Sequence, residues 1–187
     1  MTERTNQQHE MRIASASNDV EGSRALAATL NAELYLDERD TEGLPFRALL
    51  TATTDDLEPL EAIADVGLYV VCRRLVKPGE ARKIAMFPMV HRGDRTRAEC
   101  DGHWRDQHAP LALEHHPHMT QYIQLSVVHR FSGLDVQGFA MCGFDSEEDI
   151  RERFYANEES VRIITKDVLQ FADPKRSPRR LIATPAR

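Results

Sequence analysis

The sequence has 187 residues, enough for one domain or for two small ones. Apolar residues make up 41% of the chain, which is ordinary for a globular protein, and the net charge of −6 argues against a general nucleic-acid-binding protein. No segment approaches the roughly 18 apolar residues of a membrane-spanning helix, and the polar start of the sequence does not resemble a signal peptide. We therefore expect a cytoplasmic protein with no nucleic-acid or membrane partner.

The three cysteines are widely spaced along the chain, at Cys72, Cys100 and Cys142. Their number is odd, and no two of them form a C-x-x-C pair, so they do not indicate a disulfide framework or a zinc site. We expect reduced, buried thiols, and we expect neither a metal nor a cofactor.

The first 76 residues predict the order strand, helix, strand, strand, helix, strand. The expected strands are residues 11–15, 33–36, 46–53 and 66–76. The first expected helix follows a cap at Asn18 or Asp19, and the second begins at Thr54 and runs through Ile63. This is the order of a ferredoxin-like unit. The following segment 77–82, K-P-G-E-A-R, is a predicted linker.

The second part of the chain, residues 83–187, repeats this order. The expected strands are residues 83–92, 121–131, 134–144 and 179–184, and Pro88 favours an edge strand or a bulge for the first of them. The expected helices follow Thr96 and Ser146, with a further apolar stripe at Val161, Ile164 and Val168. We predict an α+β fold in which two tandem ferredoxin-like βαββαβ units pair their sheets into one barrel. The alternative is a barrel formed between two chains by their C-terminal halves, and homodimerisation is compatible with both.

The most informative stretch is residues 96–111, T-R-A-E-C-D-G-H-W-R-D-Q-H-A-P-L. Thr96 and Glu99 form a capping box that predicts a helix start. Cys100, Trp104, His108 and Leu111 share one face of this helix, whereas His103 lies about 100° from Trp104 and is expected to be exposed. Pro110 predicts a break or kink at Ala109.

The segment H-W-R-D-Q-H-A-P-L resembles the W-x-x-x-H-A-P-L motif of the EthD-like family of dimeric α+β barrel proteins. The resemblance continues through Q-Y-I-Q at 121–124, G-F-D-S at 143–146 and F-A-D-P at 171–174, and covers about residues 83–185. It implies a ferredoxin-like fold that pairs its sheet into a barrel. It also implies a site near His108, although much of this family has no established function.

His108 is the leading catalytic candidate because histidine is the usual proton carrier near neutral pH. The alternative is a core histidine that donates to a backbone carbonyl. Tyr122 and Gln124 point to the same side of their strand. If that side lines the barrel, they are hydrogen-bond donors for a substrate oxygen, and if it faces the helices, Tyr122 belongs to the core.

Three further residues are candidate contacts of a ligand. Trp104 offers an aromatic wall or, alternatively, a core side chain. His91 shares a strand face with Phe87 and Met89, and is otherwise a solvated strand end. Relatives in the resembling family often carry an acid two residues before the glycine of G-F-D-S, where this chain has Met141. That difference would remove a partner for His108 and leave a more apolar cavity.

A second histidine group, H-H-P-H at 115–118, has the residue types of a metal site. Pro117 prevents an i, i+4 helical pair, and no second cluster has metal-ligand spacing, so an ordinary loop is the better interpretation.

Two functions follow from these residues and from the resemblance. The first is a cofactor-independent acid/base enzyme, of the cyclase, dehydratase, decarboxylase or isomerase type, acting on a hydrophobic aromatic or polyketide-like small molecule. The second is a non-catalytic protein that binds such a molecule or accompanies an oxygenase. A third, structural interpretation is an oligomerisation module with a filled barrel.

Overall fold

The computed structural model describes residues 9–39, 41–53, 55 and 57–186. The elements of the first half are β1 (His9–Ser17), α1 (Val20–Leu30), β2 (Glu33–Leu36), β3 (Ala48–Ala52), α2 (Glu58–Ile63) and β4 (Gly67–Lys77). The Asp19 side chain accepts from the Gly22 amide and caps α1, as predicted. Thr54, the predicted start of the second helix, lies outside the described residues.

The second half contains a longer series of elements. These are β5 (Lys83–Met89), α3 (Arg97–His103), the π-helical turn η1 (Trp104–His108), α4 (Ala109–His115), β6 (Gln121–Gly133), β7 (Gly138–Phe144), α5 (Glu147–Glu152), α6 (Glu158–Val168) and β8 (Leu181–Ala186). The predicted capping box of Thr96 and Glu99 is present at the start of α3. The strand β6 continues through the predicted turn at Ser132 and Gly133, so residues 134–137 make the connection to β7.

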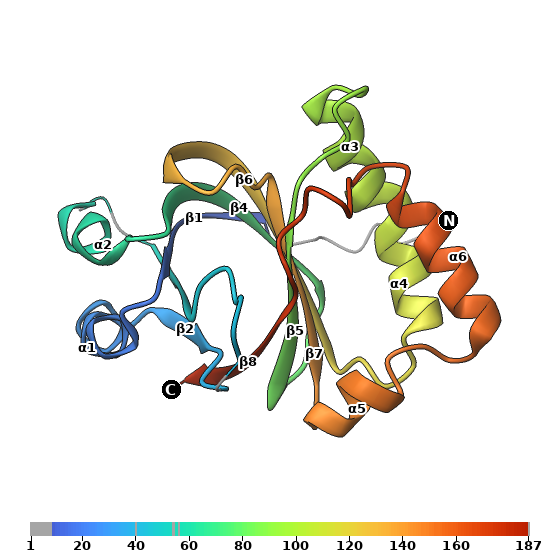
Figure 1. Cartoon of the computed structure of the whole chain (residues 1–187), viewed down its shortest axis with the longest axis horizontal. Coiled ribbons are helices and arrows are strands. Elements are labelled where there is room, and N and C mark those ends of the chain that lie inside the picture. Colours follow the sequence, from blue (N-terminus) through green and yellow to red (C-terminus); the bar gives the residue numbers. More distant parts are fainter. Residues whose placement is uncertain (1–8, 40, 54, 56, 187) are drawn as a thin grey trace.

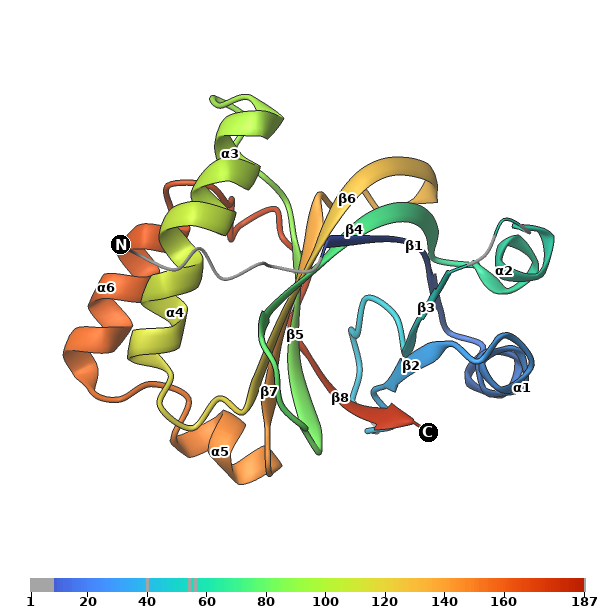
Figure 2. The same ribbon diagram turned by 180° about the vertical axis from the view of Figure 1, so that it is seen from behind.

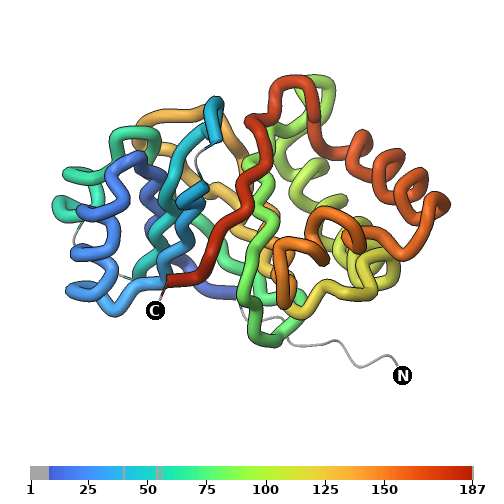
Figure 3. The backbone as a smooth tube through the Cα atoms, turned by 60° about the horizontal axis from the view of Figure 1, so that its bottom comes forward, coloured from blue at the N-terminus to red at the C-terminus, as the bar shows by residue number. Residues whose placement is uncertain are grey.

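The eight strands form one closed antiparallel barrel in the order β1-β3-β2-β8-β5-β7-β6-β4. Each half contributes four neighbouring strands, and the halves meet along two seams, β2 with β8 and β4 with β6. Figure 3 shows the first seam, where the red C-terminal strand runs beside the blue segments of the first half. A single chain therefore closes the barrel, and the alternative of a barrel formed between two C-terminal halves is wrong.

Apolar side chains fill the interior of the barrel. They come from both halves and include Leu49, Tyr69, Met86, Phe139 and Met141, each of them almost completely buried. Phe139 makes edge-to-face contacts with Phe46 and Tyr69, at centroid distances of 6.1 and 5.6 Å. The barrel interior is thus a packed core.

Helices cover the outside of the barrel on two opposite sides (Figures 1 and 2). On the first half, α1 and α2 close over an apolar layer that includes Leu34, Leu36, Leu50 and Leu60. On the second half, η1, α4, α5 and α6 cover β5, β6 and β7. No helix among the described residues has the length and apolarity to cross a membrane.

The helix around Pro110 does not break, so the predicted break at Ala109 is absent, and the irregularity takes the form of the π-helical turn η1. Ala109 keeps right-handed helical geometry, with φ −58° and ψ −47°, and its N–H donates to the Trp104 carbonyl, five residues back. Proline lacks an N–H and crowds the carbonyl four residues earlier. The chain accommodates Pro110 by widening one turn into a π-helix, which keeps α3 and α4 continuous.

The sequence predicts an edge strand or a bulge at Pro88, and the structure shows neither in that form. The strand β5 is paired on both sides, with β7 and with β8. The β8 ladder, however, ends at Met86, so Pro88 has a strand neighbour only on the β7 side. The missing N–H therefore leaves no gap in a ladder.

Candidate functional site

A cavity of about 230 Å³ lies in the second half, between the outer face of the sheet and the helices. Its floor comes from β5, β6 and β7, and its cover comes from η1, α4, α6 and the segment after α6. The aromatic and histidine side chains that line it are Phe87, Trp104, His108, His116, Tyr122, Phe154, Tyr155 and Phe171. No lysine or arginine among the described residues lines it, so the cavity suits an uncharged, largely apolar ligand.

The alternation of side chains along β7 separates this cavity from the barrel interior. Ala140 and Cys142 line the cavity, whereas Met141 between them belongs to the interior core. A carboxylate at position 141 would therefore face away from His108. The expectation that Met141 removes a partner of His108 was wrong, and Met141 does not line the cavity.

Trp104 and Tyr122 meet at one wall of the cavity. The Trp104 Nε1–H donates to the Tyr122 hydroxyl oxygen at 3.1 Å, and the Gln124 Nε2–H donates to the same oxygen at 3.2 Å. Gly138 makes room for the indole, because a Cβ there would come within 2.8 Å of the Trp104 ring. Tyr122 and Gln124 thus face the helices, and Tyr122 lines the cavity as well as belonging to the core.

The Tyr122 hydroxyl is held in its protonated form. The side chain is completely buried, and burial raises its pKa above the ordinary value for tyrosine. Its oxygen already accepts two hydrogen bonds, yet no described residue accepts its proton. The hydroxyl proton of this cavity-lining residue is therefore not shared with a described residue.

His108 is paired with a carboxylate from α6. Its Nδ1 lies 2.7 Å from Asp167 Oδ2, and the other carboxylate oxygen lies 2.7 Å from His103 Nε2. His103 is only part-buried, but it is engaged by Asp167 and stacks on Phe171, so the expectation that it is simply exposed was wrong. The Nε2 of His108 has no hydrogen-bond partner among the described residues.

The electrostatics of this group favour an ionised Asp167. Burial alone raises the pKa of the carboxyl, but the hydrogen bonds and charges of His108 and His103 outweigh burial, so the pKa lies below its usual value. An ionised Asp167 accepts the Nδ1–H of His108. When the His108 ring is neutral, this hydrogen bond keeps its proton on Nδ1 and leaves the lone pair on Nε2.

Asp167 was not identified from the sequence, although two signals mark it. It lies in the last turn of α6, where a carboxylate is disfavoured by the helix dipole. It also shares the inward stripe of α6 with Ser160 and Ile164, both of which are buried. A charged residue on such a stripe indicates a tertiary partner.

His116 is a second histidine of the cavity that sequence reasoning assigned to a plain loop. Burial lowers its pKa to about 4, so the ring is neutral at pH 7. Its Nδ1 lies 2.7 Å from the Phe154 carbonyl oxygen and must therefore carry the proton. The Nε2 of His116 is consequently an acceptor on a side chain that lines the cavity.

Two other candidates of the sequence, His91 and Gln124, are buried but are not among the described residues that line the cavity. His115 bonds Ser160, whereas His116 bonds the Phe154 carbonyl, so the H-H-P-H side chains are engaged separately. No group of three or more histidine, cysteine or acidic side chains among the described residues could hold a metal ion.

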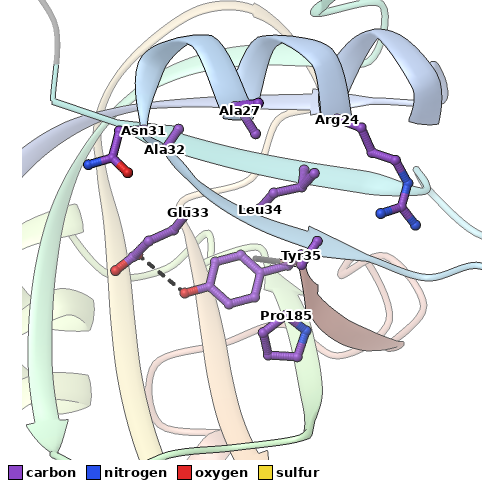
Figure 4. A pocket seen from close by; sticks show the side chains of 10 residues that line it. Arg24, Ala27, Asn31, Ala32, Glu33, Leu34, Tyr35 and Pro185 are labelled. Atoms are coloured by element: carbon purple, nitrogen blue, oxygen red, sulfur yellow. Dashed lines mark hydrogen bonds between the residues drawn. The ribbon is translucent and has the colours of Figure 1, made fainter.

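A larger recess of about 540 Å³ lies in the first half, between α1, β2 and the end of β8 (Figure 4). Its lining includes Ala27, Leu34 and Pro185, and its Tyr35 hydroxyl already donates to Glu33 at 3.2 Å. None of the described side chains that line it has a buried polar atom without a hydrogen-bond partner. Size alone therefore does not make it a site, and the cavity at His108 is the better candidate.

No protein-family model and no curated protein sequence matches the chain. Two solved structures are similar to it. An anthrone oxidase-like protein aligns with a TM-score of 0.55 and 9% identity, over 100% of this chain and 94% of its own. A candidate monooxygenase from Lactobacillus acidophilus NCFM aligns with a TM-score of 0.40 and 9% identity, over 95% and 93% of the two chains. At this identity the likeness to the anthrone oxidase-like protein is one of fold alone.

Proposed function

We propose that the cavity binds a flat, hydrophobic aromatic ketone or phenol and that His108 and Tyr122 catalyse proton transfer on it without a cofactor. The observation that carries this proposal is the His108–Asp167 pair on the wall of an apolar cavity that also presents a free tyrosine proton. The reaction class is that of a cyclase, dehydratase, decarboxylase or isomerase that acts through an enolate.

His108 acts as the base in this proposal. The hydrogen bond from Nδ1 to Asp167 orients the ring, leaves the Nε2 lone pair free and stabilises the imidazolium that forms when Nε2 takes a proton. The electron pair of the broken C–H bond moves onto the substrate oxygen. Tyr122 donates its unshared proton to this oxygen through a hydrogen bond, while Trp104 and Gln124 hold the Tyr122 oxygen in place.

The lining also indicates the class of ligand. Aromatic faces from Trp104, Phe154 and Phe171 surround the space, and aromatic rings bind flat ring systems well. The neutral His116 offers an acceptor for a ligand hydroxyl. The name of the structurally similar anthrone oxidase-like protein refers to an anthrone, a flat tricyclic ketone whose methylene C–H is acidified by conjugation with its carbonyl. Anthrone is therefore a suitable probe.

The test is hydrogen–deuterium exchange at the methylene carbon of anthrone, in deuterated buffer without oxygen, followed by mass spectrometry. We expect the wild-type protein to bind anthrone and to accelerate exchange. His108→Gln should lower this rate about 10²-fold or more, as expected for loss of a general base, and Asp167→Asn should lower it about tenfold or more.

His129→Gln is the matched control, because His129 is exposed on β6 and does not line the cavity. Its exchange rate should equal that of the wild type. Full exchange activity in a folded His108→Gln variant would remove His108 from the mechanism, and failure of the wild type to bind anthrone would contradict the ligand class.

The second candidate function is a non-catalytic binding or accessory protein of an oxygenase pathway. The predominance of apolar side chains in the cavity favours it. It predicts that the wild type binds anthrone and that exchange does not exceed the rate in buffer. The same experiment thus separates the two functions.

The finer assignment of the fold also belongs to the proposal. Both halves follow the element order βαββαβ, and their strands lie in the equivalent orders β4-β1-β3-β2 and β8-β5-β7-β6. We interpret them as two tandem ferredoxin-like units, residues 1–76 and 83–187, joined by the linker 77–82. The residues around His108 support membership of the second unit in the EthD-like family.

A further inference from the structure

The cavity at His108 has a second polar region, formed by His116 and Tyr155. His116 follows the last turn of α4, roughly two helical turns after His108. Tyr155 lies in the connection between α5 and α6. Both side chains line the cavity, and the centroids of their rings are 5.0 Å apart. Neither side chain takes part in the proton transfer proposed above.

The ring of His116 is fixed in place and presents one open nitrogen. Its Nδ1–H donates to the Phe154 carbonyl oxygen, and the ring packs edge-on against the Phe154 ring at a centroid distance of 4.5 Å. The residue is only 3% exposed, yet its Nε2 is not one of the fully enclosed, unpartnered polar atoms of the described residues. This Nε2 accepts no hydrogen bond from a described residue. It is therefore an acceptor that a molecule in the cavity can reach.

Tyr155 supplies an open donor in the same region. Burial raises the pKa of its hydroxyl above the ordinary value for tyrosine, so the group is protonated at pH 7. The hydroxyl forms no hydrogen bond with a described residue, and it is not fully enclosed either. Its ring packs edge-on against Phe154 at a centroid distance of 5.0 Å, which holds the side chain at the cavity wall.

The two open groups have complementary hydrogen-bonding roles. The neutral His116 accepts through Nε2, and the Tyr155 hydroxyl donates. A hydroxyl group both donates and accepts, so a single ligand hydroxyl can satisfy both side chains. A ketone oxygen only accepts and would leave His116 unpaired. A carboxylate would bring a charge into a cavity that no described lysine or arginine lines.

We propose that His116 and Tyr155 form a subsite that recognises a hydroxyl of the ligand, which donates to His116 Nε2 and accepts from Tyr155. This inference rests on the proposed function and narrows its substrate class to phenolic ketones, with the hydroxyl on a ring remote from the carbon at which His108 acts. A buried acceptor left unpaired weakens binding, so the subsite disfavours the same ring system without the hydroxyl. His116 is thus a specificity-determining residue.

The test compares three probes that share one flat, two-ring frame: naphthalene, 2-naphthol and 2-methoxynaphthalene. Isothermal titration calorimetry of the full-length protein at pH 7 measures their affinities. The methyl ether keeps an oxygen that can accept from Tyr155 but has no proton for His116. We expect 2-naphthol to bind about tenfold more tightly than the ether, as for one buried hydrogen bond.

His116→Phe should abolish this preference. His108→Phe is the matched control, because it makes the same substitution elsewhere on the cavity wall and should retain the preference. Tyr155→Phe keeps the ring and removes only the hydroxyl. It should weaken binding of both oxygen-bearing probes about threefold to tenfold and leave naphthalene unchanged. Circular dichroism checks that each variant is folded, and the wild-type and Tyr155→Phe measurements remain decisive even if His116→Phe does not fold.

Three results would overturn the subsite: equal affinities of the wild type for 2-naphthol and its ether, a preference that persists in folded His116→Phe, or unchanged 2-naphthol affinity in Tyr155→Phe. None of them affects the hydrogen-exchange test of His108, so the proposed function can stand without the subsite. Failure of all three probes to bind would instead contradict the apolar cavity as a ligand site, and with it both proposals.

Discussion

Two histidines near the cavity, His91 and His116, are buried as neutral rings. Burial lowers the pKa of His91 to about 4, assisted by the positive charges of Arg97 and Arg74 and opposed by the Asp101 carboxylate. An unfolded histidine titrates near 6.5. The unfolded chain therefore takes up a proton that the folded protein excludes. The stability that the neutral ring provides is complete above pH 6.5 and is lost as the pH falls towards 4.

His91→Leu should reduce this acid sensitivity. Both ring nitrogens of His91 lack partners among the described residues, so the apolar replacement loses no side-chain hydrogen bond. A pKa displaced from 6.5 to about 4 corresponds to roughly 3 kcal/mol, and the decline in unfolding free energy between these pH values should shrink by about this amount. Urea denaturation at pH 7, 5.5 and 4 measures it. An unchanged pH profile would show that His91 is not buried as a neutral ring.

For individual residues, the sequence predicts which side chains can react but not which of them lie in contact. His108 was identifiable from its helix face and its motif, and Trp104 and Tyr122 lie with it on one cavity. Asp167 lies 59 residues away in sequence from His108, and its role depends on the packing of α6 against η1. Met141 was predicted to line the cavity but lies in the barrel interior. Which face of a strand carries the site depends on how the whole barrel closes, and the sequence of that strand does not show this.

The π-helical turn η1 is the element that places Trp104 and His108 on one cavity. Such turns are rare and are often found at functional sites. The Trp104 carbonyl accepts from Ala109, five residues on, and from the Gln124 side chain at 3.0 Å. The sequence indicates an irregularity through Pro110, but local preference alone could not distinguish a break from a widened turn.

Pro110→Ala should favour return of this turn to α-helical geometry. The new N–H can donate to the Asp106 carbonyl four residues back, and alanine is the better helix former. We expect the free energy of unfolding to stay equal or to rise, while anthrone binding weakens because Trp104 and His108 rotate relative to each other. Urea denaturation and an anthrone titration measure the two effects. A destabilised variant with unchanged anthrone affinity would contradict this account of the turn.

For the whole molecule, the seam between β4 and β6 holds the two halves together. Gly133 ends β6 with a φ of +82°, opposite Gly67, and a Cβ on Gly133 would lie 1.9 Å from the Val66 carbonyl oxygen. The element order was predictable from the sequence because it depends on local periodicity. The seams were not, because they pair strands that lie far apart in the chain.

Gly133→Ala should therefore destabilise the protein by about 2 kcal/mol or more, because alanine disfavours positive φ and the seam cannot yield without moving backbone. Gly102→Ala in α3 is the control: its Cβ meets no atom within 4 Å, and it should stabilise the protein by roughly 0.5–1 kcal/mol. Thermal denaturation of both variants measures the difference. If Gly133→Ala melts at the wild-type temperature, the backbone at the β4–β6 seam can move enough to accommodate the added Cβ.

The cavity at His108 lies between the sheet and the helices of the second half, while the equivalent layer of the first half is packed with apolar side chains that include Leu34, Leu36, Leu50 and Leu60. A pair of identical subunits would carry two equivalent cavities that could influence each other. In this chain the two halves share an element order, and only the second half carries the proposed site at His108. Saturation by one ligand type should therefore follow a simple hyperbola within each barrel, with a Hill coefficient of one.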